Sequence, residues 1–259
     1  MTDPFFDQVA LLARRSVVRT ARQPANVVFP LVFPLLLLAV NSSGLKSATH
    51  LPGFPTDSYL AFALAVPFIQ GALFASLTAG QNFGEDIESG FLNRLALTPL
   101  TGTSLLAGQL AGAVTLGVAQ AALYLTVGLA AGAGFAAGAP GVPVLIALSV
   151  LITLGFGSIG ALAALRTGSG EAVQGMFPLF FVFLFLSSMA MPRNLIQHDW
   201  FQTVATYNPV SYLLEGIRSL LITGWDGEAL ALGFGVAATI AVVGISLASA
   251  SLKTRMART

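Results

Sequence analysis

Two uncharged stretches decide the fold of this chain: LLAGQLAGAVTLGVAQAALYLTVGLAA at residues 105–131 and VPVLIALSVLITLGFGSIGALAAL at residues 142–165. Between Arg94 and Arg166 there is no Asp, Glu, Lys or Arg, and membrane-spanning helices need about 20 apolar residues each. A cluster of Gly and Pro at residues 139–143 separates the two stretches. The centre of the chain is therefore predicted to cross a membrane twice.

The composition extends this prediction to the whole chain. Of 259 residues, 55% are hydrophobic and 9% are charged, and the mean hydropathy is +0.82. Soluble domains carry roughly 25% charged residues, so a water-soluble surface cannot be built from this sequence. The absence of cysteine excludes disulfides and thiolate metal sites, and the net charge of +1 gives no indication of nucleic-acid binding.

Six hydrophobic segments together predict an all-α integral membrane protein, a single domain over residues 1–259. The predicted spans cover residues 27–45, 58–80, 105–131, 142–165, 172–191 and 229–252. Pro30 and Pro34 are expected to bend or loosen the first span near its start. Residues 193–228 are too polar to span and too aromatic for a free loop, which favours short external helices at the membrane surface or re-entering it.

The N-terminal segment, residues 1–25, is predicted to form an amphipathic helix that lies on the membrane surface. It lacks the continuous apolar core of a signal peptide. Gln8, Arg15, Arg19 and Arg22 share one face, and apolar residues recur on the other at helical spacing. The alternative is an extension of the first span that only carries positive charge.

The distribution of basic residues predicts the orientation. Nine of the 12 Lys and Arg residues fall on one side of the six-span topology: Arg14, Arg15, Arg19, Arg22, Arg94, Arg166, Lys253, Arg255 and Arg258. Because basic residues concentrate in cytoplasmic loops, we expect a multi-pass protein of the cell membrane with both termini in the cytoplasm.

The sequence contains no recognisable catalytic or nucleotide-binding motif. His50 and His198 have no second ligand at metal-binding spacing, and no G-x-x-x-x-G-K-[ST] loop is present. If a nucleotide drives this protein, we expect another chain to bind it. The predicted spans also lack charged residues, which argues against a proton-coupled or sodium-coupled carrier.

Several uncharged features inside the spans each have two interpretations. Gln70, Gln109 and Gln120 either form hydrogen bonds between helices or contact a substrate. The spacings Gly108-x-x-x-Gly112, Gly128-x-x-x-Gly132 and Gly134-x-x-x-Gly138 serve either packing within the chain or a dimer contact. In the fifth span, residues 177, 181 and 185 are phenylalanines on one face, suited to lipid, to packing or to an apolar substrate.

Three segments in this order resemble the type-2 permeases of ATP-binding cassette (ABC) exporters, the family of daunorubicin-resistance-like and polysaccharide-export permeases. The first is the basic N-terminal helix. The second is the stretch from Glu85 to Pro99, similar to the Glu…Gly…Leu…Thr-Pro signature of the family. The third runs from Tyr207 to Arg218 and is similar to the Asn-Pro…Glu…Arg segment of the family.

The resemblance implies that residues 85–99 form a cytoplasmic coupling helix, between spans two and three, that enters a cleft of a separate ATPase subunit. Three apolar residues would form the ridge that fills the cleft: Phe91, Leu92 and Leu95. Four charged residues would pair at its rim: Glu85, Asp86, Glu88 and Arg94. ATP and Mg²⁺ would bind to the ATPase and no cofactor to this chain. The alternative is a solvated turn between spans.

The resemblance also implies an external gate before the last span. The corresponding residues are Asn208, Pro209, Tyr212, Glu215 and Arg218. Glu215 and Arg218 are three positions apart on a predicted helix, so they either form an ion pair or lie on a solvated surface.

By this resemblance the chain is the transmembrane subunit of an ATP-driven exporter, working as a homodimer or heterodimer with a second permease copy. The family places substrate between spans two and five, where the candidate residues are Phe68, Gln70, Phe177, Phe181 and Phe185. Their character favours a hydrophobic drug or a lipid over a polysaccharide or glycolipid. A channel or secondary carrier that needs no ATPase is the alternative class; a membrane-embedded enzyme would need clustered polar groups, which the sequence lacks.

Overall fold

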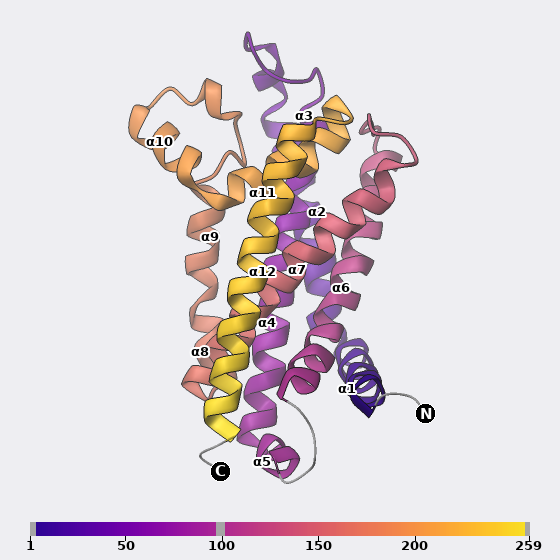
Figure 1. Ribbon diagram of the computed structural model, residues 1–259. Helices are drawn as coiled ribbons and strands as arrows, with labels where there is room; N and C mark the ends of the chain where they lie inside the picture. Colours follow the sequence, from indigo (N-terminus) through magenta and orange to yellow (C-terminus); the bar gives the residue numbers. More distant parts are fainter. Residues whose placement is uncertain (1–3, 97–101, 257–259) are drawn as a thin grey trace.

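The structure, a computed structural model, describes residues 4–96 and 102–256, which form helices joined by turns (Figure 1). The longer helices are α1 (Pro4–Ala21), α2 (Pro24–Gly44), α4 (Ala65–Glu88), α6 (Gly102–Ala130), α7 (Gly141–Thr167) and α12 (Gly227–Met256). The short α-helices are α3 (Tyr59–Ala63), α5 (Phe91–Ala96), α8 (Gly170–Gly175), α9 (Phe177–Phe185), α10 (Asp199–Tyr207) and α11 (Pro209–Arg218). Single turns of 3₁₀ or π-helix occur at η1 (Lys46–His50), η2 (Arg193–Leu195) and η3 (Ser219–Thr223).

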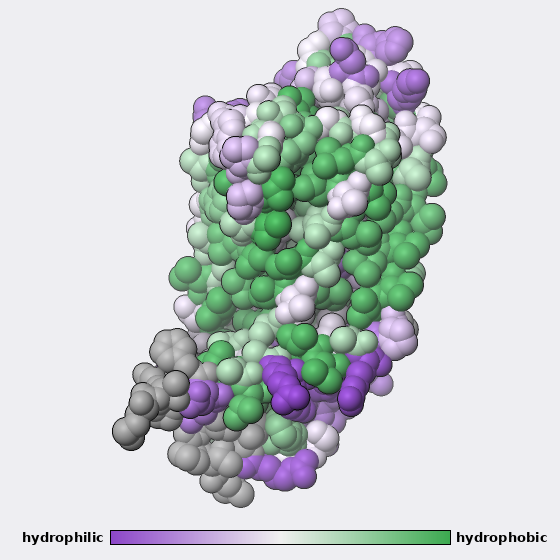
Figure 2. Space-filling view, turned by 90° about the vertical axis from the view of Figure 1, so that its right-hand side faces the viewer, coloured by the Kyte–Doolittle hydropathy of each residue, from purple (hydrophilic) through white to green (hydrophobic). Residues whose placement is uncertain are grey.

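Five of the six predicted spans are confirmed as helices long and apolar enough to cross a membrane. Within the described residues they are Val27–Gly44, Tyr59–Glu88, Gly102–Ala130, Gly141–Thr167 and Gly227–Met256. The second of these combines α3 and α4. Figure 2 shows the result at the surface, a wide hydrophobic band between two hydrophilic ends. The molecule is therefore a helical bundle with the exterior of a multi-pass membrane protein.

The fifth predicted span differs from its expected form. Residues 172–191 do not form one helix: α8 and α9 meet at a turn at Met176, and residues 186–189 form turns. Pro178 has no N–H to donate to the carbonyl of Gln174, which explains why the helix is interrupted here. The apolar helical segment Gly170–Phe185 is thus shorter than the other five.

The centre of the bundle is α4. Of its most apolar window 89% is buried, against 17% for α2 and 22% for α12, so these two helices lie at the periphery of the bundle. Close packing of α4 against α7 depends on Gly160, because a Cβ there would collide with the backbone carbonyl of Ser76.

The two prolines of the first span lie within a helix that is continuous from Pro24 to Gly44. Pro34 cannot donate a hydrogen bond to the carbonyl of Pro30, four residues earlier. The hydroxyl of Tyr124 in α6 donates to this carbonyl instead, at 2.6 Å. A contact between α2 and α6 thereby satisfies the carbonyl that the proline leaves without its helical partner.

The N-terminal helix is separate from the first span and packs on α6. The boundary lies at Arg22 and Gln23, directly before Pro24, a residue that disfavours helix at the position before it. A Cβ at Gly112 would collide with Ser16, whose hydroxyl donates to the carbonyl of Gln109 at 2.8 Å. The helix is therefore not a continuous extension of α2.

Of the three G-x-x-x-G spacings, one packs two helices together and two do not. Gly108 and Gly112 pack against Leu12 and Ser16 of α1, which confirms a role in packing within the chain. The other two spacings are not helix-packing motifs, because α6 ends at Ala130 and Gly132 already has a positive φ of 90°. Of these, Gly128 alone lies in α6, where it packs against Leu64.

Candidate functional site

A buried carboxylate at the end of α4 binds the N-terminal helix. Asp86 is 2% exposed, and its two oxygens accept hydrogen bonds from Nη1 and Nη2 of Arg15 at 2.9 and 2.7 Å. Arg19 Nη1 donates to Oδ1 at 2.9 Å, and the side-chain amide of Gln109 in α6 also donates to Asp86. We call Arg15, Arg19, Asp86 and Gln109 the carboxylate clamp.

The clamp follows from helix geometry. Arg15 and Arg19 are four residues apart and therefore lie on one face of α1. The packing of α1 on α6 turns this face toward the last turn of α4. A buried carboxylate is costly unless it is paired and hydrogen-bonded, and the two guanidinium groups meet this requirement. The hydrogen bond with Asp86 raises the pKa of Arg15 above its ordinary value.

The clamp changes the assignment of the predicted coupling residues. Helix α4 continues to Glu88, so Glu85, Asp86 and Glu88 belong to its last turn, and α5 follows after a bend at Gly90. The prediction that Asp86 pairs at the rim of an ATPase cleft is wrong, because its carboxylate faces α1. Glu85 is exposed and binds Arg19.

The predicted apolar ridge is also partly turned inward. Leu92 is 3% exposed and packs in a core cluster of this chain, so it cannot fill a cleft of another protein. Phe91 is half-buried beneath the guanidinium of Arg15, 3.9 Å from the ring centre. Glu88 and Arg94 are exposed. The side chain of Leu95, and Pro99 as a whole, lie outside the described residues.

The arginine partners of Asp86 are not among the predicted site residues. Arg15 and Arg19 were assigned to the polar face of a surface helix, and Asp86 to a loop on the same side of the membrane. The usable signal was this shared side: two arginines at helical spacing and a carboxylate beside a long apolar segment. Nothing in the sequence separation of 71 residues between Arg15 and Asp86 indicates contact.

A second candidate site is a cavity of about 390 Å³ between α2, α4, α8 and α9. The ring of Phe74 contacts two other rings of the lining, with ring centres 5.6 Å from Phe29 and 5.3 Å from Phe177. We call this cavity the aromatic groove. Its lining residues are Phe29, Pro30, Phe74, Leu77, Thr78, Gln81, Gln174 and Phe177.

The phenylalanines of the fifth span lie on one face, as predicted. Ring centres of Phe177 and Phe181 are 4.7 Å apart, and those of Phe181 and Phe185 are 6.2 Å apart. Only Phe177 of these three lines the aromatic groove, whereas Phe185 is 58% exposed. The row therefore leads from the groove to the outer surface of α9.

The other two substrate candidates lie elsewhere. Phe68 is buried edge-on against Tyr124 of α6, with ring centres 5.7 Å apart. Gln70 is buried beside a small cavity that Asn41 also lines. The structure thus does not bring these two residues together with Phe177. Among the glutamines, Gln109 forms the predicted hydrogen bond between helices, in the clamp.

The third candidate site, at the opposite end of the bundle, surrounds a buried arginine. Arg218 is 6% exposed and donates to three backbone carbonyls: Nε to Phe62 at 3.0 Å, Nη1 to Ser188 at 2.7 Å and Nη2 to Met189 at 2.8 Å. Its guanidinium stands 3.5 Å from the centre of the Phe62 ring. Burial lowers the pKa of Arg218 to about 9, so the group is still protonated at neutral pH.

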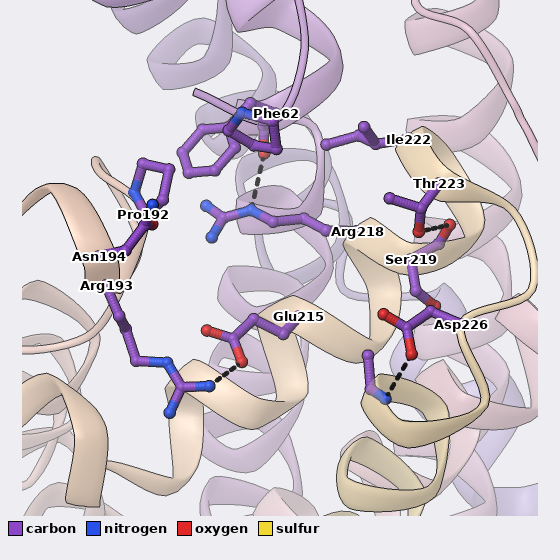
Figure 3. A pocket seen from close by; sticks show the side chains of 12 residues that line it. Phe62, Pro192, Arg193, Asn194, Glu215, Arg218, Ser219, Ile222, Thr223 and Asp226 are labelled. Atoms are coloured by element: carbon purple, nitrogen blue, oxygen red, sulfur yellow. Dashed lines mark hydrogen bonds and ion pairs between the residues drawn. The ribbon is translucent and has the colours of Figure 1, made fainter. Parts of the chain in front are cut away.

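Neither alternative for Glu215 and Arg218 holds, because the two side chains do not pair and Arg218 is buried. Glu215 binds Arg193 of η2 instead, as Figure 3 shows. The reason is that Arg218 points to carbonyls in α3 and after α9, whereas Glu215 points to η2. The Arg193 guanidinium also lies 4.7 Å from the ring centre of Tyr212.

Asn208 and Pro209 begin α11 and attach it to α9. The side-chain oxygen of Asn208 accepts from the N–H of Val210 at 2.9 Å, an N-terminal cap, and its amide donates to the carbonyl of Phe183 at 2.6 Å. Pro209 occupies the first helical turn, where its missing N–H has no cost. The predicted gate residues thus hold the segment after α9 to the bundle.

Comparison with known proteins gives the family. Residues 7–222 match the ABC-2 type transporter family. The chain is 28% identical to the daunorubicin resistance ABC transporter permease protein DrrB1 of Streptomyces coeruleorubidus, over 83% of this chain and 75% of the relative. It is 26% identical to "Probable doxorubicin resistance ABC transporter permease protein DrrC" of Mycobacterium tuberculosis (strain CDC 1551 / Oshkosh), over 85% and 79%. With its apolar helices, the chain is a multi-pass membrane permease that belongs to the ABC-2 type transporter family.

Proposed function

We propose that this chain is the transmembrane subunit of an ABC exporter that moves a hydrophobic, drug-like molecule or a lipid out of the cytoplasm. The observation that carries the substrate class is the aromatic groove. Its walls are phenylalanine, proline and leucine, and its polar groups are a threonine and two glutamines, without a charged residue. Such a lining suits an apolar molecule with a few hydrogen-bonding groups. Two relatives carry the names of daunorubicin and doxorubicin resistance permeases.

A separate ATPase subunit, which binds ATP and Mg²⁺, would supply the energy at the end of the bundle that carries α5. Figure 1 places α1, α5 and the C-terminal end of α12 at this end. Glu88 and Arg94 are exposed there, and Glu88 also accepts a hydrogen bond from the N–H of Gly170 at 3.4 Å. Because Asp86 joins α4 to α1, a push on α5 would move the central helix and the N-terminal helix together.

A second permease copy, identical or homologous, would complete the transport path. The groove lies beside the exposed residues of α2 and α9, helices at the periphery of the bundle, where a second copy can approach. Rearrangement between the two copies would then move substrate from the groove to the opposite end.

The coupling role is tested by a double charge reversal, Glu88→Lys with Arg94→Glu. The full chain is purified from membranes together with its ATPase, and ATP hydrolysis is measured in the eluate. We expect the reversal to release the ATPase or to abolish stimulation of its activity. The matched control is Asp199→Lys, an exposed carboxylate at the opposite end of the bundle. Unchanged association and hydrolysis in the double variant would refute a coupling role for α5.

The substrate class is tested with daunorubicin, whose fluorescence reports binding to the purified chain. Removing an aromatic contact costs about 1 kcal/mol, so we expect Phe177→Ala to weaken binding about fivefold. Phe185→Ala, on the exposed part of the same face, should have little effect. Equal effects of the two variants would exclude the groove as the binding site. Uptake of the drug by vesicles with this chain alone, without ATP or an ATPase, would instead indicate a channel or secondary carrier.

A further inference from the structure

The surroundings of Arg218 form a cavity at the end of the bundle opposite α5. Its volume is about 400 Å³, within the range of small-molecule sites. Segments far apart in the sequence contribute Pro55, Phe62, Arg193, Glu215, Arg218 and Asp226, and Figure 3 shows the charged side chains around one space. We call this cavity the arginine pocket.

The arginine pocket contains both signs of charge in equal number. Two guanidinium groups, of Arg193 and Arg218, face two carboxylates, of Glu215 and Asp226. A guanidinium has five N–H donors, and the carbonyl contacts of Arg218 occupy three of them, which leaves two. Among the described residues Arg193 forms a hydrogen bond through Nη2 alone, to Glu215, so its other donors are available as well.

Asp226 also keeps capacity for a ligand. Its Oδ1 accepts from the backbone N–H groups of Glu228 and Ala229, both at 3.1 Å, and thereby caps α12. Over the described residues its second oxygen, Oδ2, accepts no hydrogen bond, and the residue is exposed. The pocket therefore offers anion-binding donors and a cation-binding acceptor at different points of one cavity.

This balance selects the charge type of the ligand. A purely anionic molecule would meet the carboxylates of Glu215 and Asp226, and a purely cationic one would meet the two arginines, at a cost in both cases. A molecule with a phosphate and an amine separated by a short linker can satisfy both. Arginine is well suited to phosphate because its planar donors bind two oxygens at once.

The level at which the arginine pocket lies in the membrane points to a lipid as the source of such a group. Three large aromatic residues at this end are exposed: Trp200 is 64%, Tyr207 is 83% and Trp225 is 56% exposed. Exposed Trp and Tyr concentrate at the level of the lipid headgroups. Trp225 directly precedes Asp226, so the pocket lies at this level.

We propose that the arginine pocket binds the zwitterionic phosphoethanolamine headgroup of a membrane phospholipid. The phosphate contacts the free N–H groups of Arg193 and Arg218, and the ammonium contacts Oδ2 of Asp226. This site is distinct from the aromatic groove, and its occupancy does not depend on which molecule the protein exports.

The test is competition between two lipids for the purified full chain, followed by native mass spectrometry in detergent. Dioleoyl phosphatidylethanolamine carries the proposed headgroup, and dioleoyl phosphatidylglycerol has the same chains and phosphate without the amine. We expect the wild type to retain phosphatidylethanolamine preferentially, and soluble O-phosphoethanolamine to displace it. This comparison needs no variant, so it stands even if a substitution disturbs folding.

Asp226→Asn removes the contact with the amine and keeps the helix cap, because Asn caps helices as well as Asp does. We expect it to lower the preference for phosphatidylethanolamine about tenfold, equivalent to about 1.4 kcal/mol. Asp199→Asn, an exposed carboxylate at the same end outside the pocket, should leave the preference unchanged. Equal retention of both lipids by the wild type, or equal effects of the two variants, would overturn the proposal. Binding of O-phosphoethanolamine without retention of either lipid would assign the pocket to a soluble zwitterion instead.

Discussion

Two buried charges in this chain are satisfied in different ways. Asp86 is neutralised by two arginines from another helix, whereas Arg218 has its contacts with three backbone carbonyls and one aromatic ring. Both lie outside the apolar centre of the spans, near opposite ends of the bundle. Each contributes to fixing the position of a helix end, because charged hydrogen bonds require a defined geometry whereas hydrophobic contacts are non-directional.

The clamp can be measured with a double-mutant cycle of Arg15→Gln and Asp86→Asn. Residues that share one ion-pair network are coupled, so we expect the two effects on unfolding free energy to be non-additive by about 1–3 kcal/mol. The control cycle combines Asp86→Asn with Arg94→Gln, an exposed arginine of α5, and should be additive within about 0.5 kcal/mol. Denaturant unfolding in detergent provides the values. Additivity in the first cycle would contradict the clamp.

Arg218→Met tests the carbonyl contacts, because methionine keeps the length of the side chain and removes its donors. A hydrogen bond to a charged group contributes about 1.5–3 kcal/mol, so we expect a loss of at least about 2 kcal/mol in unfolding free energy. Arg166→Met, at an exposed arginine in the last turn of α7, should change it by less than about 0.5 kcal/mol. Thermal unfolding in detergent compares the two variants. If both variants have the same thermal midpoint, the hydrogen bonds of Arg218 with the three carbonyls do not stabilise the fold.

At the scale of the helices, contacts depend on residues without large side chains. Between α1 and α6 the backbones approach at Gly108 and Gly112, and between α4 and α7 at Gly160. Helices in a membrane gain no hydrophobic free energy from leaving lipid, so close packing over small residues becomes the main attraction between them. The hydrophobic periodicity of these segments is correspondingly uninformative about which helix packs where.

Gly112→Ala tests the contact of α1 with α6. The added Cβ collides with Ser16, so we expect a loss of about 1–3 kcal/mol in unfolding free energy, typical of overpacking. The control is Gly235→Ala in α12, where no atom lies within 4 Å of the new Cβ. Alanine favours helix by up to about 1 kcal/mol, so the control should be neutral or stabilising. If the two substitutions have the same effect on the thermal midpoint, α1 does not pack at Gly112.

In the whole molecule, the two ends of the bundle differ in structure, and this difference determines the direction in which it can transport a substrate. One end has the clamp, α5 and the last turn of α12 with Lys253 and Arg255, and the other has the arginine pocket with its exposed aromatic residues. The aromatic groove lies between them. An energy source at the first end and a headgroup site at the second are compatible with transport along the long axis.

The orientation can be tested directly because the chain has no cysteine. A single cysteine at Asn194, exposed near the arginine pocket, should react with a membrane-impermeant maleimide added to intact cells. A cysteine at Arg14, exposed on α1, should react only after the cells are opened. Both expectations follow from the excess of basic residues at the end that carries α1. Labelling of Arg14→Cys in intact cells would reverse the proposed direction of transport.

The spans could be predicted because hydropathy is a local property of about 20 consecutive residues. Four of the six predicted spans agree with the helices within a few residues at each end, the second continues eight residues further, to Glu88, and the fifth is interrupted at Met176, before Pro178. The candidate site was harder, since residue type does not show which way a side chain points. Leu92 was expected on the surface and is buried, and Glu215, for which a pair with Arg218 and a solvated position were both open, binds Arg193.

The sequence by itself determined that this is a multi-span membrane protein, which segments form five of its six predicted spans, and that three segments resemble those of type-2 permeases. Only the tertiary structure decided that Asp86 faces α1 and that Arg218 binds the carbonyl of Phe62, 156 residues away. The physical reason is that insertion of a segment into a bilayer depends on the hydropathy of about 20 consecutive residues, which is a local property of the sequence. An ion pair or hydrogen bond depends on two atoms approaching within about 3 Å at a defined angle, and packing of the whole bundle sets that approach.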